Sequence, residues 1–453
     1  MPKGKLYKKL TTWFQAHGGL LACIFAGLVF FLPYERIVTL ELPLVPGGYT
    51  LRLSHVFALL LISGFFAAVV FSRRKVSLRS WDYLLAGFLF SYLISALLAQ
   101  DLKRALIVWV FTVFVALMAF VVSQIIRKDW LQYVEPVLAT TTWIVLIFGF
   151  YQYFGDSLGL STGVTGLRDM YTRGVLGFPR IQSFGLEPLY YASFLQIPLY
   201  YYLVQFIFGQ KKRPWLILAI LCQIILTVSR GAVIASVFAI ILFIAVLICV
   251  RWKSIVWKHV AYFGMIVFAA ILLSYGMIQV SSKLTEIAER STTKQGQQDR
   301  VQSTFRQTTN LDEQDDRTRN RTIALEAWQQ NPLLGIGPGN FDGFAVAAFP
   351  PYADSEGYVI VNNQPIELLA ESGLVGFTIF LSFAVVVVFN NIVYIVHDKK
   401  LKSSASLLAI AGLMYLVALA IQYQTFSTLY ILHIWLVFGV MMGVARLSAV
   451  HKQ

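Results

Sequence analysis

The sequence predicts an all-α polytopic membrane protein with about twelve transmembrane helices and one large extracytoplasmic loop that contains short helices. Hydrophobic residues make up 57% of the 453 residues and charged residues only 13%. The mean hydropathy of +0.67 lies far above that of soluble domains. Apolar runs of about 17 to 25 residues, the length that crosses the hydrocarbon core of a bilayer, recur along the whole chain.

These runs predict twelve spans. In chain order they lie near residues 17–33, 53–71, 82–99, 105–126, 133–154, 189–208, 214–229, 231–250, 256–280, 374–396, 404–423 and 427–446.

The distribution of basic residues predicts which connections are cytoplasmic. More than half of the 37 Lys and Arg residues fall in the N-terminal segment, the C-terminal tail and every second short connection. Because cytoplasmic loops carry the excess of Lys and Arg, both termini are expected in the cytoplasm. The net charge of +14 therefore reflects membrane orientation. No basic residues cluster on a soluble surface in the way that nucleic-acid binding requires, so no nucleic-acid partner is expected.

The chain divides into three parts on this topology. Residues 1–280 hold the first nine spans and an outer loop at 155–188, residues 281–363 form the large extracytoplasmic loop, and residues 364–453 hold the last three spans. Within the large loop, 291–316 has few apolar residues and is expected to be flexible. The stretch "NRTIALEAWQQ" at 320–330 has an N-cap residue and an apolar stripe, which predict a short helix lying on the rest of the protein.

Arg230, in "LTVSRGAVIA", follows an unusually short span. Sixteen residues rise only about 24 Å, less than the roughly 30 Å core, so Arg230 is expected somewhat below the outer lip of the membrane. An arginine there requires a wet or anionic cavity, or else extends to the lipid headgroups. Ser229 and Gly231 leave little room for that extension, which favours the cavity.

Arg180 and Glu187 stand just before a span, in "FPRIQSFGLEPLYYASF". One interpretation is an anion-binding arginine near a carboxylate, because the planar guanidinium donates two parallel hydrogen bonds to phosphate oxygens. The other is an interfacial belt of aromatic residues with a structural salt bridge. The sequence supports both equally.

Two glutamates four residues apart open the tenth span, in "IVNNQPIELLAESGLVG". Pro365 suits the first turn of a helix, and Glu367 there complements the helix dipole. Glu371 lies one turn deeper and gains little from the dipole, while the like charge of Glu367 disfavours it. Glu371 therefore requires a partner, for which we expect an arginine of the large loop, Arg180 or Arg230.

Four blocks together resemble the O-antigen ligase and polysaccharide polymerase superfamily. "FPRIQSFGLEPLYYASF", "LTVSRGAVIA", "NPLLGIGPGNF" and "NNQPIELLAESGLVGF" occur in that order between about 178 and 376. The resemblance implies transfer of a glycan from an undecaprenyl-diphosphate carrier to the hydroxyl of a glycan or lipid acceptor. The reaction would take place at the outer face of the bacterial cytoplasmic membrane, among membrane lipids, inverting and without a metal or other cofactor.

The resemblance also implies roles for individual residues. Arg180 and Arg230 would hold the diphosphate and stabilise it as the leaving group. An arginine among Arg317, Arg319 and Arg321 would match a further arginine ahead of the Asn-Pro turn, and of these Arg317 and Arg321 are the predicted diphosphate ligands. The histidine of the family falls on Asn362. An amide cannot take a proton, so Asn362 would orient the acceptor, and Glu371 or Glu187 would activate it.

Asn362 leaves the subtype and the activity open. Ligase and polymerase are equally compatible with the sequence, and a glycolipid-binding homologue without transferase activity is a third alternative. A transporter or flippase of a lipid-linked saccharide would also suit twelve spans. Such transporters usually place ionisable groups near the midplane, however, whereas here the charged candidate residues gather at the outer surface.

Overall fold

Helices occupy all twelve predicted spans in the computed structural model. The structure describes residues 19–37, 39–41, 50–71, 75–126, 130–208, 213–251, 257–290, 311–354, 359–398 and 403–449. The helices at the predicted positions are α2 Leu20–Phe31, α3 Leu53–Phe71, α4 Ser80–Leu97, α5 Leu102–Ile125, α6 Leu131–Ser157, α9 Pro188–Ile207, α10 Pro214–Leu226, α11 Arg230–Arg251, α12 Trp257–Arg290, α16 Gln364–His397, α17 Ser404–Gln422 and α18 Leu432–Ala449.

Eight of these helices are long and apolar enough to cross a membrane, and three of the others (α2, α10 and most of α18) are shorter apolar helices. The remaining one, α9, has 20 residues, several tyrosines and an internal Pro198. Nearly all of its residues are buried, so its polar groups face other helices. The expected all-α membrane protein is confirmed.

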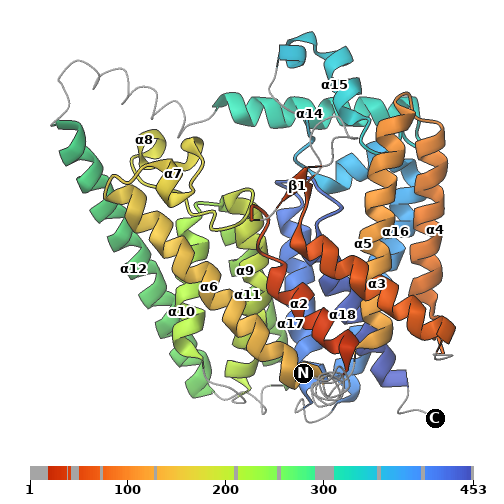
Figure 1. Cartoon of the computed structure of the whole chain (residues 1–453), viewed down its shortest axis with the longest axis horizontal. Helices are drawn as coiled ribbons and strands as arrows, with labels where there is room; N and C mark the ends of the chain where they lie inside the picture. Colours follow the sequence, from red (N-terminus) through yellow and green to blue (C-terminus); the bar gives the residue numbers. More distant parts are fainter. Residues whose placement is uncertain are drawn as a thin grey trace, which may run out of the picture.

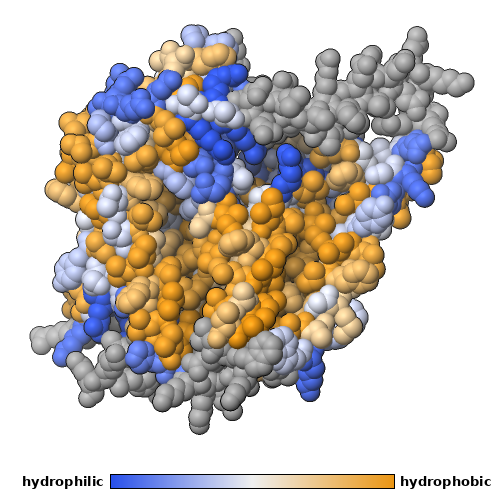
Figure 2. All heavy atoms as spheres, turned by 180° about the vertical axis from the view of Figure 1, so that it is seen from behind, coloured by the Kyte–Doolittle hydropathy of each residue, from blue (hydrophilic) through white to orange (hydrophobic). Residues whose placement is uncertain are grey.

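The bundle has two distinct ends (Figure 1). One end, which we call the loop face, carries the helices that lie between the spans. These are α7 Thr162–Thr165, α8 Arg173–Leu176, α14 Leu311–Gln330 and α15 Phe341–Ala348. At the opposite end, α2 begins and α18 ends. Between the two ends, Figure 2 shows a broad apolar belt bordered by hydrophilic residues, as expected for a surface that contacts lipid.

Small residues and side-chain amides join the helices inside this belt. Gly439 and Gly443 of α18 lie so close to α5 that an added Cβ would collide with Ala119 and Ile126. Gln196 of α9 donates to the carbonyl oxygen of Ala232 at 3.1 Å and thereby ties α9 to α11. Such contacts are typical of membrane bundles, where close backbone approach and interhelical hydrogen bonds replace the hydrophobic effect.

The long loop before α16 is more helical than expected. The helix predicted at 320–330 is present and lies across the loop face (Figure 1), with Ile323, Ala324 and Ala327 buried. It begins at Leu311, however, so the end of the segment expected to be flexible is helical. Residues 291–310 of that segment lie outside the described residues. Phe341 and Ala345 of α15 and Val361 complete the small core beneath α14.

The end of α12 and the connection between α2 and α3 also differ from the expected architecture. Helix α12 continues to Arg290, past the predicted end of the span at residue 280. A two-stranded antiparallel hairpin, β1 Leu40–Glu41 with β2 Thr50–Leu51, connects α2 to α3 at the loop face. A 3-10 turn at Asp169–Tyr171 and another at Pro350–Asp354 complete the elements.

A buried ion pair at the end opposite the loop face fastens α4 to α18. Arg446 donates to both carboxylate oxygens of Asp82, and both residues are less than a tenth exposed. Removing one member of such a pair leaves the other charge buried and uncompensated.

We therefore expect Arg446→Ala to lower the free energy of unfolding by about 3–5 kcal/mol, measured by thermal or denaturant unfolding in detergent. Arg319 is a suitable control, since its pair with Asp316 is exposed, and Arg319→Ala should leave the midpoint nearly unchanged. Equal midpoints for the two variants would contradict the assignment.

Candidate functional site

A break in α16 receives the glycine-rich turn at 331–340. Gly373 has φ 62° and ψ −171° inside the helix, a conformation open almost only to glycine. The carbonyl oxygens released on one side of the break accept from the turn, Ala370 from the N–H of Ile336 at 2.9 Å and Glu371 from that of Gly337 at 3.0 Å. On the other side, the N–H of Leu374 donates to Pro332 at 2.8 Å. Backbone hydrogen bonds thus join the turn to the helix on both sides of the break.

Glu371 holds the same junction through its side chain. One carboxylate oxygen accepts from the Tyr92 hydroxyl of α4 at 3.1 Å, and the other accepts from the N–H of Gly339 at 2.8 Å. The expectation that an arginine of the large loop, Arg180 or Arg230 would be this partner is wrong. The break in α16 turns Glu371 toward α4 and the turn, where a hydroxyl and a backbone N–H meet it.

Arg180 lies against the C-terminal end of α10. The N–H of Ile181 donates to the carbonyl oxygen of Leu226 at 3.2 Å, which draws the loop before α9 down onto α10. The guanidinium of Arg180 donates to the carbonyl oxygen of Thr227 at 3.1 Å and lies over the ring of Tyr171. The bonding partner of Arg180, Thr227, thus stands three residues before Arg230 in the chain.

Arg230 is the first residue of α11. Helix α10 has only 13 residues and rises about 20 Å, so the turn into α11 lies below the tip of longer neighbours. In that turn, Val228 has a φ of 53°. The Arg230 side chain is exposed. A cation at a helix N-terminus is unfavourable against the helix dipole, whereas an anion placed there is stabilised by the free N–H groups. Arg230 and the N-terminus of α11 together favour an anion.

Helix α14 contributes the third arginine. Arg321 donates to the carbonyl oxygen of Gln424 at 2.8 Å, and its Nε is buried without a described hydrogen-bond partner. Gln424 precedes Thr425, which packs directly on Gly231. Arg321 therefore reaches the same turn that contacts the start of α11.

The helical period separates the arginines of α14. Arg317 lies one turn before Arg321 and shares its face. Arg319 points elsewhere, where it pairs with Asp316 and stacks on Phe349. Among the three arginines that could have matched the family pattern, Arg317 and Arg321 are thus the two that face the same way.

Asn362 stands where α16 meets the connection between α17 and α18. It has a positive φ of 55°, and its neighbour Asn363 caps α16 by accepting from the N–H of Ile366. Asn363 also bonds Gln424 at 3.1 Å and Ser427 at 2.9 Å. Residues 423–431, which we call the central turn, therefore touch the α14 arginine, the start of α11 and the Asn362–Asn363 pair.

Glu187 is the N-cap residue of α9. It lies near Arg180, on what we call the arginine side of the site, the region around Arg180, Arg230 and Arg321. Burial raises the pKa of its carboxyl, and the positive charges of Arg168 and Arg180 partly offset that rise. Arg168 thus joins the predicted Arg180 near this carboxylate, although no motif marked it in the sequence.

A polar cavity of about 450 Å³ lies on the other side of the central turn. Its volume is within the range of small-molecule sites. Charged residues from distant segments line it, namely Glu35, Arg52, Arg104, Asp342, Glu367 and Glu371. Of the predicted site residues, only Glu371 is among the lining residues. The structure therefore separates Glu371 from the predicted arginines, whereas Glu187 lies near Arg180. The contribution of Arg52 and Arg104 was missed because it depends on tertiary contacts alone.

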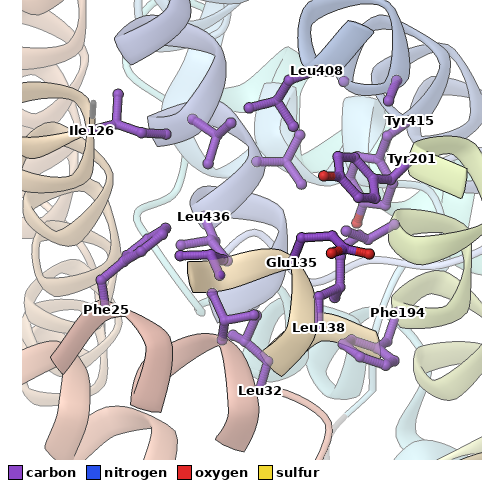
Figure 3. Close-up of a pocket in the computed structure, with 17 residues that line it drawn as sticks. Phe25, Leu32, Ile126, Glu135, Leu138, Phe194, Tyr201, Leu408, Tyr415 and Leu436 are labelled. Carbon is purple, nitrogen blue, oxygen red and sulfur yellow. The ribbon is translucent and has the colours of Figure 1, made fainter. Parts of the chain in front are cut away.

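A second pocket, of about 110 Å³, lies toward the opposite end of the bundle and is almost entirely apolar. Figure 3 shows Phe25, Leu32, Leu138 and other hydrocarbon side chains around a single carboxylate, Glu135. That carboxylate pairs with Arg213 at 2.9 Å. This lining suits hydrocarbon and offers a saccharide almost no hydrogen-bond partners.

A metal ion has no evident place in the part of the chain that the structure describes. No group of three or more His, Cys, Asp or Glu side chains there is arranged to hold one.

Comparison with protein families agrees with the resemblance of three of the four sequence blocks, while the block at 178–194 lies outside the matched residues. Residues 215–381 match the family model described as O-antigen ligase. The chain contains an O-antigen ligase domain. This domain runs from α10 into α16, so it includes Arg230, Asn362 and the junction at Glu371, while Arg180 and the central turn lie outside it. No curated protein sequence matches the chain.

The junction between α16 and the glycine-rich turn yields a prediction on the O-antigen ligase domain. A Cβ at Gly373 would collide with the backbone of Leu333 and adopt a strained conformation, at a backbone cost of about 1–3 kcal/mol. Gly373→Ala should therefore detach the turn and increase hydrogen exchange across residues 331–340. Gly343→Ala is the control, because its Cβ would meet open space. Equal protection in the two variants would show that the turn does not depend on the break.

Proposed function

We propose that the protein transfers a glycan from an undecaprenyl-diphosphate carrier to an acceptor hydroxyl, as an O-antigen ligase or a related polysaccharide polymerase. The observation that supports this most is the convergence of Arg180, Arg230 and Arg321 on the central turn and the end of α10. The family match supports ligase-type or polymerase-type chemistry in general.

In this proposal the loop face is extracytoplasmic and the protein lies in the bacterial cytoplasmic membrane. The excess of Lys and Arg in the connections at the other end supports this orientation, with both termini in the cytoplasm. The carrier would then present its diphosphate at the membrane surface, where the arginines lie.

Arg180 and Arg230 would bind the diphosphate, with Arg321 and Arg317 of α14 closing over it. Two negatively charged phosphates leave when the glycosidic bond breaks, and guanidinium groups already in place stabilise that charge without reorganisation. Arginines would thus balance the charge without a metal ion. The transfer would be a single displacement that inverts the anomeric centre.

The acceptor requires a group that takes its proton. Asn362 lacks one, and we propose that it orients the acceptor through its amide. Glu187 and Glu371 remain the predicted candidates for activation. The raised pKa of Glu187 makes its carboxylate a better proton acceptor than an ordinary glutamate.

The two cavities argue against a transporter of lipid-linked saccharide. The polar cavity lies among residues of the loop face, whereas the pocket toward the other end is lined almost entirely by hydrocarbon (Figure 3). A saccharide passing between the faces requires polar groups along its path.

Arg230→Ala should reduce transfer about 100- to 1,000-fold, the usual loss when one preorganised donor to a developing anion is removed. The measurement is transfer of a lipid-linked glycan by the purified protein in proteoliposomes. Arg230→Lys should restore only part of the rate, since an ammonium cannot replace the two parallel hydrogen bonds. Arg319→Ala, on the other face of α14, is the matched control. Unaltered transfer in Arg230→Ala would remove this residue from the mechanism.

Asn362 also favours a second candidate, a glycolipid-binding homologue without turnover. The two functions differ in the response to Asn362→His. An active transferase should retain or gain transfer when the imidazole base is supplied. Binding of the lipid-linked glycan with no product in either protein would support the inactive homologue.

A further inference from the structure

The polar cavity differs in charge from the arginine side of the site. Four carboxylates and two arginines line it. Arg52 pairs with Glu35 at 2.9 Å, and Arg104 pairs with Asp342 at 2.8 Å. Each arginine is thereby matched by a carboxylate, and Glu367 and Glu371 are two further carboxyl groups beyond those pairs. The lining thus has more carboxyl groups than arginines and suits phosphate poorly.

The same cavity has the wall chemistry of a sugar site. Carboxylates accept hydrogen bonds from hydroxyl groups, and the rings of Tyr92, Tyr190 and Phe341 offer flat apolar surfaces to the C–H faces of a pyranose. Tyr190 also approaches the Thr428 hydroxyl of the central turn at 3.3 Å. Small-molecule sites commonly combine such apolar walls with a few directed polar groups.

The central turn places this cavity beside the arginines. Gln424, at its beginning, accepts from Arg321, whereas Ser427 to Leu432 line the cavity. Asn363 bonds both Gln424 and Ser427 and so lies at the boundary. A donor held by the arginines and an acceptor held in the cavity would meet across Asn362 and Asn363.

Glu367 and Glu371, which lie outside these two ion pairs, are not equivalent. Glu371 uses one oxygen for Tyr92 and the other for Gly339, so it is committed to the junction with the glycine-rich turn. Glu367 lies one turn nearer the boundary, and its Oε2 accepts from the N–H of Val361, the residue before Asn362. Glu367 is therefore the carboxylate that connects the cavity to the position of the missing histidine.

We propose that the polar cavity is the acceptor site, that it takes a saccharide without negative charge, and that Glu367 receives the proton of the acceptor hydroxyl. This proposal rests on the proposed function. The acceptor oxygen would form a bond to the anomeric carbon as the bond from that carbon to the diphosphate oxygen breaks. The diphosphate would leave with the electron pair, and the proton would pass to the Glu367 carboxylate and then to water.

The test measures binding of short saccharides to the full-length protein in nanodiscs. The neutral probes are chitotriose, maltotriose, cellotriose and mannotriose, and the anionic probe is trigalacturonate. We expect at least one neutral trisaccharide to bind and trigalacturonate not to bind. Glu367→Gln should weaken the neutral ligand about tenfold, the effect of losing hydrogen bonds to a charged group. Arg319→Ala, which lies outside the cavity lining, is the control.

Two outcomes would overturn the proposal. One is that none of the neutral trisaccharides binds, and the other is that Glu367→Gln binds as tightly as the unaltered protein. Glu367→Asp keeps the charge on a shorter side chain and guards against misfolding of the glutamine variant, since it should fold normally and restore part of the binding. Matching thermal midpoints check that all variants fold.

The design separates this proposal from the proposed function. Arg230→Ala should bind the neutral trisaccharide normally while losing transfer, because the arginine belongs to the donor side. Loss of transfer in Arg230→Ala without any saccharide binding would disprove only the acceptor site. Saccharide binding without transfer from any lipid-linked donor would disprove only the transferase.

Discussion

The contact on which the site depends is the junction between Glu371 and the glycine-rich turn. A helix broken at Gly373 releases backbone carbonyls and N–H groups inside the protein, and buried backbone groups are costly without partners. The turn at 331–340 supplies those partners, and Glu371 fixes the turn through Gly339 while reaching Tyr92 of α4. Helix α14 ends directly before this turn and α15 begins directly after it. Their positions over the loop face follow from the junction.

Charge is divided across the loop face, and this division organises the proposed chemistry. The arginines proposed to receive a diphosphate lie around the end of α10, the start of α11 and α14, while carboxylates dominate the cavity between α3, α4, α5 and α16. An anionic leaving group and an acceptor that must lose a proton have opposite electrostatic needs. The central turn keeps the arginines and the carboxylate-rich cavity adjacent and separate.

In this arrangement Asn362 has a structural role in place of a proton-accepting one. Where the resemblance of the sequence places the histidine of the family, the chain has an amide in a left-handed conformation, beside an asparagine that caps α16 and bonds the central turn. These hydrogen bonds fix the backbone at Asn362 and Asn363. The proposed proton acceptor, Glu367, lies about one turn further along in α16. The O-antigen ligase domain would thus retain the shape of the site with the base relocated.

The sequence alone determined the features that depend on local order. The spans, the charge asymmetry between the two ends, the apolar stripe of α14 and the start of α16 near Pro365 follow from residue length, period and capping, all of which are read within a few turns. Three of the four motif blocks lie within residues 215–381, which match the O-antigen ligase model. The structure moved boundaries, as at Leu311 and Arg290, because packing extends a helix beyond the point where local propensity ends it.

Only the tertiary structure decided which groups meet. Tyr92 and Glu371 are separated by 279 residues, and Arg104 and Asp342 by 238. No local pattern records such a pairing, so an arginine was wrongly expected beside Glu371, and Arg52 and Arg104 went unnoticed. Hydrophobic period states which face of a helix is buried, but the identity of the neighbour depends on how the helices pack, and that packing is set by the whole chain at once.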